Sequence, residues 1–219
     1  MPEAILFDLD GTLADTVHDL AGAINLLRAE HDLPPLPLAH LRPHASAGSR
    51  GLLQAGLNLA PGDADYAVMQ QRFLTLYENN LCRGTRLFQG VPELLDRIEA
   101  EGMPWGIVTN KLARFTLPLV EMLGLTHRAK CIISGDSTPR PKPFPDSLQL
   151  ACASLAVVAP RCVYVGDDER DVIAGRSANM KTIIALWGYL GTEKSPAEWG
   201  ANASARTPQD ILRIAAAKL

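Results

Sequence analysis

The sequence predicts an α/β fold with a doubly wound parallel-sheet core and a small all-helical cap inserted after the first strand. Five short runs rich in Ile, Val and Leu lack alternation with polar residues, which is typical of strands covered on both faces. These runs are Ala4–Phe7, Trp105–Val108, Cys131–Ser134, Val163–Val165 and Thr182–Leu186. Segments with helical spacing separate the later runs, and this alternation predicts a parallel sheet. The predicted helices are Pro92–Ala100, Phe115–Leu123, Asp146–Leu155, Asp171–Ala178 and one from Thr207 to the C-terminus.

The cap is predicted from a long stretch, following the first strand, that contains no clear strand run. Leu20–Glu30 and Tyr66–Leu81 have helical apolar spacing, and Leu33–Pro37 (Pro-rich) and Ala45–Gly51 (Gly/Ser-rich) divide the stretch. An insertion at this point would cover the carboxyl edge of the sheet, where open α/β sheets bind ligands. The predicted domains are residues 1–14 and 90–219 for the core and 15–89 for the cap.

The composition is that of a globular enzyme and argues against several classes of partner. The 219 residues are 47% hydrophobic and carry a net charge of −3, so no positive field attracts nucleic acid or an anionic membrane. No apolar run approaches the roughly 20 residues that span a bilayer, and no secretion signal is evident. The four cysteines form no CxxC pair, so buried thiols are expected. We expect a soluble cytoplasmic protein, monomeric or homodimeric.

The first candidate motif is Asp8-Leu9-Asp10-Gly11-Thr12, directly after the first predicted strand. Two carboxylates held this close repel each other, so a cation is expected between them. Oxygen ligands favour Mg²⁺. The alternative is an Asp-Gly turn in which Thr12 has a capping role.

The second motif, Thr109-Asn110, ends the second predicted strand. A hydroxyl, an amide and exposed backbone N–H groups can together bind phosphate oxygens. A Thr-Asn pair is also typical of a turn or helix cap, so this motif is weak by itself.

The third motif is Lys142, which stands between Pro141 and Pro143. The flanking prolines fix the backbone of this lysine in an extended loop. A fixed ammonium can offset the charge of a phosphate and of a nucleophilic carboxylate. The alternative is an exposed loop lysine.

The fourth motif is a dense acidic cluster, Asp167, Asp168, Glu169 and Asp171, which follows one strand and opens a helix. Any one of these residues fits a helix N-terminus. So many carboxylates directly after an apolar strand are better explained by a metal site. All four motifs adjoin the carboxyl ends of predicted strands, where this architecture forms its sites.

In this order, the motifs resemble those of the haloacid dehalogenase superfamily of phosphatases, over nearly the whole chain. The predicted insertion is similar to the family's mobile helical cap. The resemblance implies that Asp8 is the nucleophile and that Asp10 is the general acid and then the general base. It further implies catalytic roles for Thr109 and Lys142, phosphate binding by Asn110, Gly11 and Thr12, Mg²⁺ coordination by Asp8, Asp10 (through its backbone carbonyl) and Asp167, and outer positions for Asp168 and Asp171. The implied substrate is a small phosphorylated metabolite.

Asp10 discriminates between branches of the superfamily. A halide leaves without a proton, whereas an alkoxide needs one, so a second acid favours phosphate chemistry over dehalogenation. A sugar-phosphate mutase shares both acids and stays an alternative.

Within the superfamily, the chain is most similar to the phosphoglycolate phosphatase-like group. The segment Ser46–Gly51 resembles this group's Gly-rich cap segment, in which Arg50 is a candidate for binding a substrate carboxylate; the alternative is a solvated surface arginine. Tyr164–Gly175 and Trp187–Tyr189 look like the N-acetylmuramic acid 6-phosphate phosphatases of cell-wall recycling. For Trp187–Tyr189, packing against the sheet edge is the simpler interpretation.

Two other classes of function are alternatives to a phosphatase. A binding or regulatory protein on this scaffold need not keep both acids, the lysine and the metal cluster. A phosphoaspartate receiver also has an acidic pocket with a lysine, but it fits the helical insertion poorly.

Overall fold

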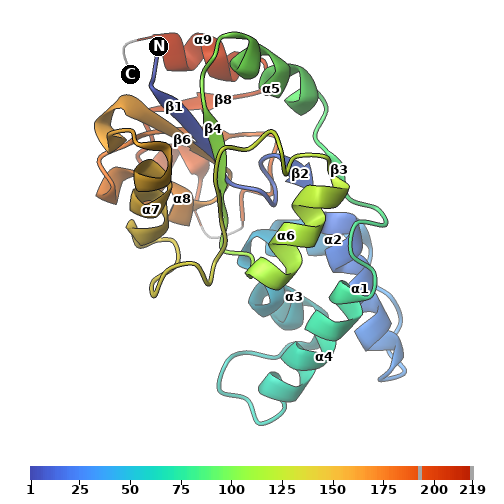
Figure 1. Cartoon of the computed structure of the whole chain (residues 1–219). Helices are drawn as coiled ribbons and strands as arrows, with labels where there is room; N and C mark the ends of the chain where they lie inside the picture. The colour runs from blue at the N-terminus through green and yellow to red at the C-terminus, as the bar shows by residue number, and fades with distance from the viewer. Residues whose placement is uncertain (192–193, 218–219) are drawn as a thin grey trace.

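The computed structural model describes residues 1–191 and 194–217 and confirms the predicted α/β fold (Figure 1). Its centre is a parallel sheet with the strand order β5-β4-β1-β6-β7-β8. The strands are β1 (Ala4–Phe7), β4 (Trp105–Val108), β5 (Ile132–Ile133), β6 (Cys162–Gly166), β7 (Lys181–Ala185) and β8 (Ala203–Ala205). The five predicted runs therefore form strands, and β1, the first in the chain, lies near the middle of the sheet.

Helices cover both faces of this sheet, because alternate side chains of a strand point to opposite sides. In β1, Ile5 and Phe7 join one apolar cluster, which α5, α6 and α9 complete. Ala4 and Leu6 join a second cluster with α7 and α8. The helices of the core are α5 (Val91–Ala100), α6 (Ala113–Met122), α7 (Asp146–Leu155), α8 (Glu169–Ser177) and α9 (Asp210–Ala216), with short 3-10 turns η2 (Ala159–Arg161) and η3 (Pro196–Glu198).

Two strand features were missed by the sequence interpretation. The edge strand β8 pairs in parallel with β7, although its sequence, Ala-Ser-Ala, contains no β-branched residue. In addition, β2 (Ala14–Asp15) and β3 (Arg86–Leu87) form a short antiparallel ribbon where the insertion joins the sheet. Both are stabilised by pairing with distant segments, which local composition does not reveal.

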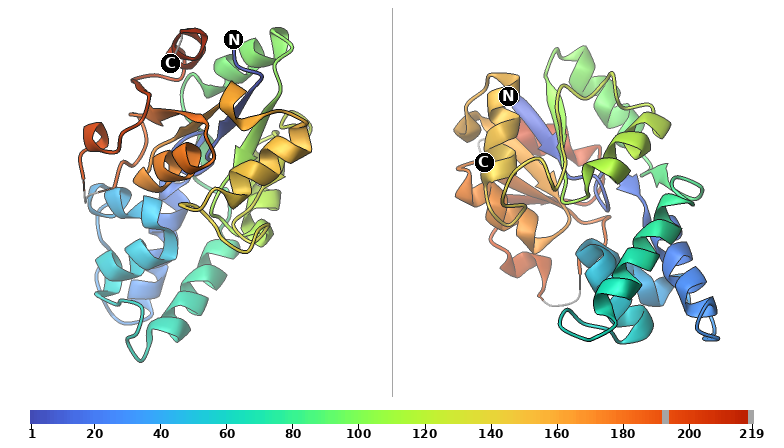
Figure 2. Two further views of the ribbon diagram at one scale, coloured as in Figure 1. Left: turned by 90° about the vertical axis from the view of Figure 1, so that its left-hand side faces the viewer. Right: turned by 60° about the horizontal axis from the view of Figure 1, so that its bottom comes forward.

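The inserted stretch is helical apart from that ribbon, and it gathers at the carboxyl end of the sheet strands in every view (Figures 1 and 2). It comprises α1 (Val17–Ala29), α2 (Leu38–Leu41), η1 (Arg42–Ala47), α3 (Gly48–Leu57) and α4 (Tyr66–Glu78). We propose that residues 15–89 act as the cap, with the ribbon as its root. The expected Gly/Ser divider, Ala45–Gly51, is in fact helical, because α3 buries Leu52 and Leu53 against the other cap helices.

The cap also packs on the core. Phe115 of α6 and Tyr189, which follows β7, belong to the same apolar cluster as the cap helices. Among the described residues, no helix combines the length and the apolar character needed to cross a membrane.

Candidate active site

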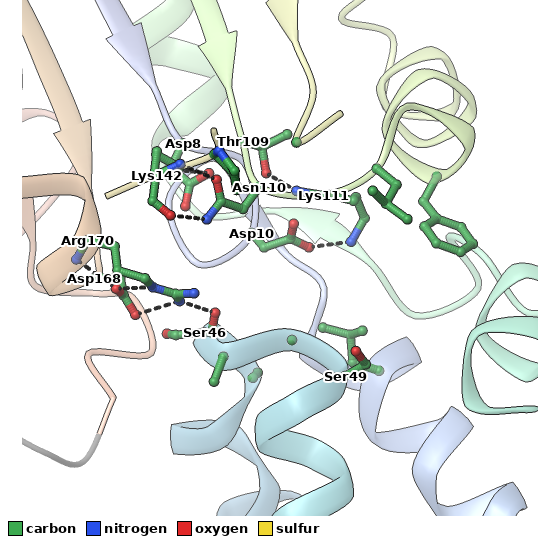
Figure 3. Close-up of a pocket in the computed structure, with 18 of the residues that line it drawn as sticks. Asp8, Asp10, Ser46, Ser49, Thr109, Asn110, Lys111, Lys142, Asp168 and Arg170 are labelled. Carbon is green, nitrogen blue, oxygen red and sulfur yellow. Dashed lines mark hydrogen bonds and ion pairs between the residues drawn. The ribbon is translucent and has the colours of Figure 1, made fainter. Parts of the chain in front are cut away.

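The carboxyl ends of three adjacent strands bring the sequence motifs together. Asp8 follows β1, Thr109 follows β4 and Asp167 follows β6, and β1 lies between the other two strands. These ends open into a cavity of about 480 Å³ between the core and the cap (Figure 3). The polar residues that the core contributes to its wall include Asp8, Asp10, Thr109, Asn110, Lys111, Lys142, Asp167, Asp168, Arg170 and Asp171. The cap contributes Ser46, Ser49, Gln70, Phe73 and Tyr77, among others.

Three carboxylates form the acidic centre of the cavity. Asp8, Asp167 and Asp171 each offer an oxygen, and these oxygens all lie within 4.8 Å of one another. Burial, with repulsion from Asp171 and Asp10, raises the pKa of Asp8 to about 7 against the attraction of Lys142. Burial and repulsion from Asp8 and Asp171 likewise raise the pKa of Asp167 well above its usual range. The three carboxylates thus repel one another, and their hard oxygen donors fit Mg²⁺.

Lys142 is the cation nearest to this centre. Its ammonium lies 2.9 Å from Asp8 Oδ1 and 2.7 Å from Asp171 Oδ1, and it donates to Tyr164 Oη (2.7 Å) and to the Val108 carbonyl (3.1 Å). Burial alone would lower the pKa of Lys142, but the attraction of Asp171 and Asp8 raises it. This lysine is therefore a fixed, charged group at the nucleophile.

Asn110 holds Lys142 in place. Its Nδ2 donates to the Lys142 carbonyl at 2.8 Å, and its Oδ1 accepts from the Lys142 N–H at 2.9 Å. The nitrogen and the oxygen of the Asn110 side-chain amide thus both bind the backbone of Lys142. Thr109 lies beside it, almost fully buried, and its Oγ1 accepts a hydrogen bond from the Lys111 N–H (3.2 Å). Its own hydroxyl proton is left for a ligand in the cavity.

Gly11 and Thr12, in the loop after β1, support Asp167 instead of lining the cavity. Thr12 Oγ1 donates to Asp167 Oδ1 at 3.0 Å, and the Gly11 N–H donates to the Ala14 carbonyl at 2.9 Å. A Cβ on Gly11, whose φ is +83°, would meet Asp167 Oδ2 at 2.2 Å, so only glycine fits here. The structure does not bring these two predicted phosphate-binding residues to the cavity wall.

Asp167 is also held by the segment after β7. The Tyr189 N–H donates to Asp167 Oδ2 at 2.8 Å. Gly188 lets this segment approach Asp167 closely, because a Cβ at this position would meet the Asp167 Cβ at 2.2 Å. The Trp187 indole N–H donates to the Thr12 carbonyl at 3.0 Å. Trp187–Tyr189 therefore does more than pack against the sheet, because it fixes a carboxylate of the acidic centre.

Asp10 points away from the acidic centre. Its Oδ1 accepts hydrogen bonds from Thr16 Oγ1 (2.6 Å) and from the Lys111 ammonium (2.8 Å). Figure 3 shows Asp10 and Lys111 joined by this ion pair. The carboxylate of Asp10 is thus available to a substrate, while metal coordination through its backbone carbonyl stays a prediction.

Asp168 and Asp171 form a capping box at the N-terminus of helix α8. Asp168 Oδ1 accepts from the Arg170 N–H (2.9 Å), and Asp171 Oδ2 accepts from the Asp168 N–H (3.1 Å). The cap and core meet here, because Arg170 binds both Asp168 and the Ser46 carbonyl. Burial would raise the pKa of Asp168, but the Arg170 guanidinium lowers it. Asp168 therefore binds Arg170, whereas Asp171 lies inside the acidic centre.

The structure does not bring Arg50 to this cavity. Its side chain is exposed and lines a neighbouring hollow with Gln54 and Trp199. The cations that do line the cavity are Lys142, Arg170 and Lys111. Sequence reasoning missed the last two, although Lys111 directly follows the Thr109-Asn110 motif.

Comparisons with known proteins agree with this geometry. The family model described as haloacid dehalogenase-like hydrolase matches residues 5–185. The chain is 41% identical over 218 residues to a phosphoglycolate phosphatase of Xanthomonas campestris, covering 98% of this chain and 97% of that protein. It is 37% identical over 212 residues to an N-acetylmuramic acid 6-phosphate phosphatase of Pseudomonas aeruginosa, covering 97% and 94%. A crystal structure of a predicted phosphoglycolate phosphatase from Haemophilus somnus superposes with a TM-score of 0.84 at 26% identity, covering 97% of each chain.

Proposed function

Because this chain belongs to the haloacid dehalogenase-like hydrolase family, we propose that it hydrolyses a small phosphorylated metabolite through a phosphoaspartate at Asp8, with Mg²⁺ as its cofactor. Its curated relatives are named phosphatases, and the chain is a phosphomonoester hydrolase of this family. Our proposal goes beyond this activity in three respects, which are the phosphoaspartate at Asp8, the Mg²⁺ cofactor and the identity of the substrate.

One observation carries the assignment of the nucleophile. Asp8 Oδ1 is bound by the Leu9 N–H (2.8 Å) and by Lys142 (2.9 Å), whereas Asp8 Oδ2 has no hydrogen bond among the described residues. One oxygen therefore fixes the carboxylate and the other is free to attack. A nucleophile held in this way needs little reorganisation to reach phosphorus.

We propose that Asp8, Asp167 and Asp171 hold Mg²⁺, because their oxygens lie within 4.8 Å of one another. A bound Mg²⁺ supplies positive charge that offsets the repulsion between a phosphate dianion and the attacking carboxylate. Lys142 adds a second positive charge beside Asp8 Oδ1.

The proposed reaction has two displacements. Asp8 attacks phosphorus, the ester P–O bond breaks, and Asp10 gives its proton to the departing alkoxide. Asp10 then takes a proton from water, the water oxygen attacks phosphorus, and the bond to Asp8 breaks to release phosphate. Thr16 orients Asp10 for both proton transfers. In this proposal, the Thr109 hydroxyl and the Asn110 backbone, which line the cavity, bind phosphoryl oxygens.

For the substrate, we propose a phosphoglycolate-like ester, as the relative from Xanthomonas suggests. The second candidate is N-acetylmuramic acid 6-phosphate, which the relative from Pseudomonas and the size of the cavity support. A cavity of about 480 Å³ with apolar walls from Phe73, Leu74 and Phe115 has room for a sugar. A sugar-phosphate mutase is the third alternative, and it requires a bisphosphate to turn round in the same cavity.

The test is phosphate release from a panel of both esters, common sugar phosphates and p-nitrophenyl phosphate, with Mg²⁺ and with EDTA. We expect release that depends on Mg²⁺ and fastest turnover on one of the carboxylate-bearing esters. Absence of release by folded wild-type protein on every compound would remove the proposal. Conversion of a hexose 1-phosphate to its 6-phosphate without net release would favour the mutase.

A further inference from the structure

Lys111 lies in the cavity with a positive charge that the reaction described above does not use. Its side chain is 8% exposed, and its ammonium lies 2.8 Å from Asp10 Oδ1 and 4.8 Å from the centre of the Tyr77 ring. Burial would lower the pKa of Lys111, but attraction by Asp10 raises it above its usual value, so the ammonium stays charged. Asp10 takes one of its three N–H donors, which leaves capacity for a second anion.

The other cations of the cavity are fully engaged. Lys142 contacts Asp8, Asp171, Tyr164 and a backbone carbonyl. Arg170 binds Asp168 through two nitrogens and also the Ser46 carbonyl. Of the three cations on the described cavity wall, Lys111 is therefore the one best able to meet a further anionic group.

A second donor lies next to Lys111. The Tyr77 hydroxyl belongs to a side chain that is 2% exposed. Lys111 attracts it, but no described residue lies in hydrogen-bond geometry to it. Burial raises the pKa of Tyr77 to about 12, so the hydroxyl keeps its proton. A buried hydroxyl on a cavity wall that lacks a well-formed hydrogen bond is costly unless a ligand satisfies it.

The position of the pair relative to Asp10 specifies which part of the substrate it meets. Asp10 must reach the ester oxygen that leaves, and Lys111 is one hydrogen bond away from Asp10. A group attached close to that oxygen therefore lies near Lys111 and Tyr77. The phosphate itself would lie on the opposite side, where Asp8 attacks it and Lys142 offsets its charge.

We propose that Lys111, assisted by the Tyr77 hydroxyl, recognises a carboxylate of the substrate close to the phosphate ester and so determines specificity. This inference rests on the proposed function. It replaces Arg50, which lies outside the cavity, as the residue that meets the carboxylate. Thr16 still orients Asp10, so Lys111 is free to turn from Asp10 toward the substrate.

The experiment compares two esters that differ in one group, 2-phosphoglycolate and 2-hydroxyethyl phosphate. Wild type is expected to prefer the carboxylate ester in kcat/KM. Lys111→Met should lose about 10- to 100-fold on 2-phosphoglycolate, mainly through KM, because a charged hydrogen bond is removed. The loss on 2-hydroxyethyl phosphate should be much smaller, so the preference disappears. Lys111→Arg should keep part of the preference, and Tyr77→Phe should weaken it.

Lys130→Met is the matched control, because Lys130 is an exposed lysine of the core outside the cavity wall. It should leave the preference unchanged. Equal losses on both esters in Lys111→Met would mean that Lys111 only orients Asp10, and this outcome overturns the inference. A wild type without preference between the esters overturns it as well. Hydrolysis of p-nitrophenyl phosphate separates these outcomes from failure of the proposed function.

Discussion

The Lys142 ammonium lies 2.9 Å from Asp8 Oδ1, and both residues are largely shielded from solvent. The lysine belongs to a loop far along the chain from the first strand, so only the fold brings the two together. The same oxygen of Asp8 also accepts the Leu9 N–H. This arrangement fixes the orientation of the carboxylate and leaves its second oxygen directed to a ligand.

Replacing Lys142 with Met should lower kcat by about 10²- to 10³-fold, because a preorganised positive charge at the reacting phosphate is lost. It should also destabilise the fold by about 3 kcal/mol or more, since Asp171 keeps a buried charge without its partner. Steady-state kinetics and urea unfolding measure the two effects. The double variant with Asp171→Asn should regain stability without regaining activity. Unchanged kcat in the folded single variant would argue against a role for Lys142 in the reaction.

Asp8→Asn should abolish turnover while preserving the fold. The variant should be as stable as wild type without metal, because it removes one of three mutually repelling carboxylates. Phosphate release and thermal unfolding in EDTA test both statements. Activity of Asp8→Asn within tenfold of wild type would refute the assignment of Asp8 as the nucleophile.

Asp10→Asn should slow alkyl phosphates far more than aryl phosphates. A phenolate leaves without a proton, whereas an alkoxide depends on the acid that Asp10 supplies. The measurement is the loss of kcat in Asp10→Asn, relative to wild type, on p-nitrophenyl phosphate and on 2-phosphoglycolate. Equal losses on the two compounds would be inconsistent with an acid at this position.

The effect of Mg²⁺ on thermal stability should depend on pH. The folded pKa of Asp8, about 7, lies above the ordinary value of 3.8, so the stability that this group contributes is full below pH 3.8 and is lost as pH rises through 7. Mg²⁺ compensates the charge only when the carboxylates are ionised. We expect Mg²⁺ to raise Tm by several degrees at about pH 8 and by much less at about pH 5. If calorimetry showed that Mg²⁺ raises Tm equally at both pH values, this account of the acidic centre would be contradicted.

Gly188→Ala should weaken Mg²⁺ binding. The added Cβ would meet the Asp167 Cβ at 2.2 Å and the Gly11 carbonyl at 2.5 Å, so Asp167 must shift. Titration calorimetry should show a Kd for Mg²⁺ at least about 10-fold higher, as for loss of a supporting contact. Gly22→Ala is the control, because no atom lies within 4 Å of its Cβ position in α1 and alanine favours a helix. A wild-type Kd in Gly188→Ala would show that this close approach does not position Asp167.

The sheet was predictable because its strands are buried on both faces and read as continuous apolar runs. Helix α7 was predicted to the residue. Strand β8 was not, because Ala203–Ala205 becomes a strand only through pairing with β7. The start of α3 was hidden by Gly48 and Gly51, whose low helical propensity is overridden by packing of Leu52 and Leu53.

Asp8, Thr109 and Asp167 were predictable as neighbours because each directly follows a strand, whereas Lys142 belongs to the loop between β5 and α7. Asp171 was expected at the periphery, but the capping box of α8 turns its carboxylate into the acidic centre. Tyr189 supports Asp167 through a contact between residues 22 positions apart, and no local pattern signals it. Lys111 and Tyr77 meet only because the cap folds over the core.

The most direct test of the central claim is detection of the phosphorylated aspartate itself. Asp10→Asn, mixed with p-nitrophenyl phosphate and Mg²⁺, should accumulate the intermediate, because the base for the second displacement is missing. Acid quench, borohydride reduction and peptide mass spectrometry should then find homoserine at position 8 alone, and none in the variant that also carries Asp8→Asn. Release of p-nitrophenolate over many turnovers without any modified Asp8, or with modification of another residue, would contradict the account.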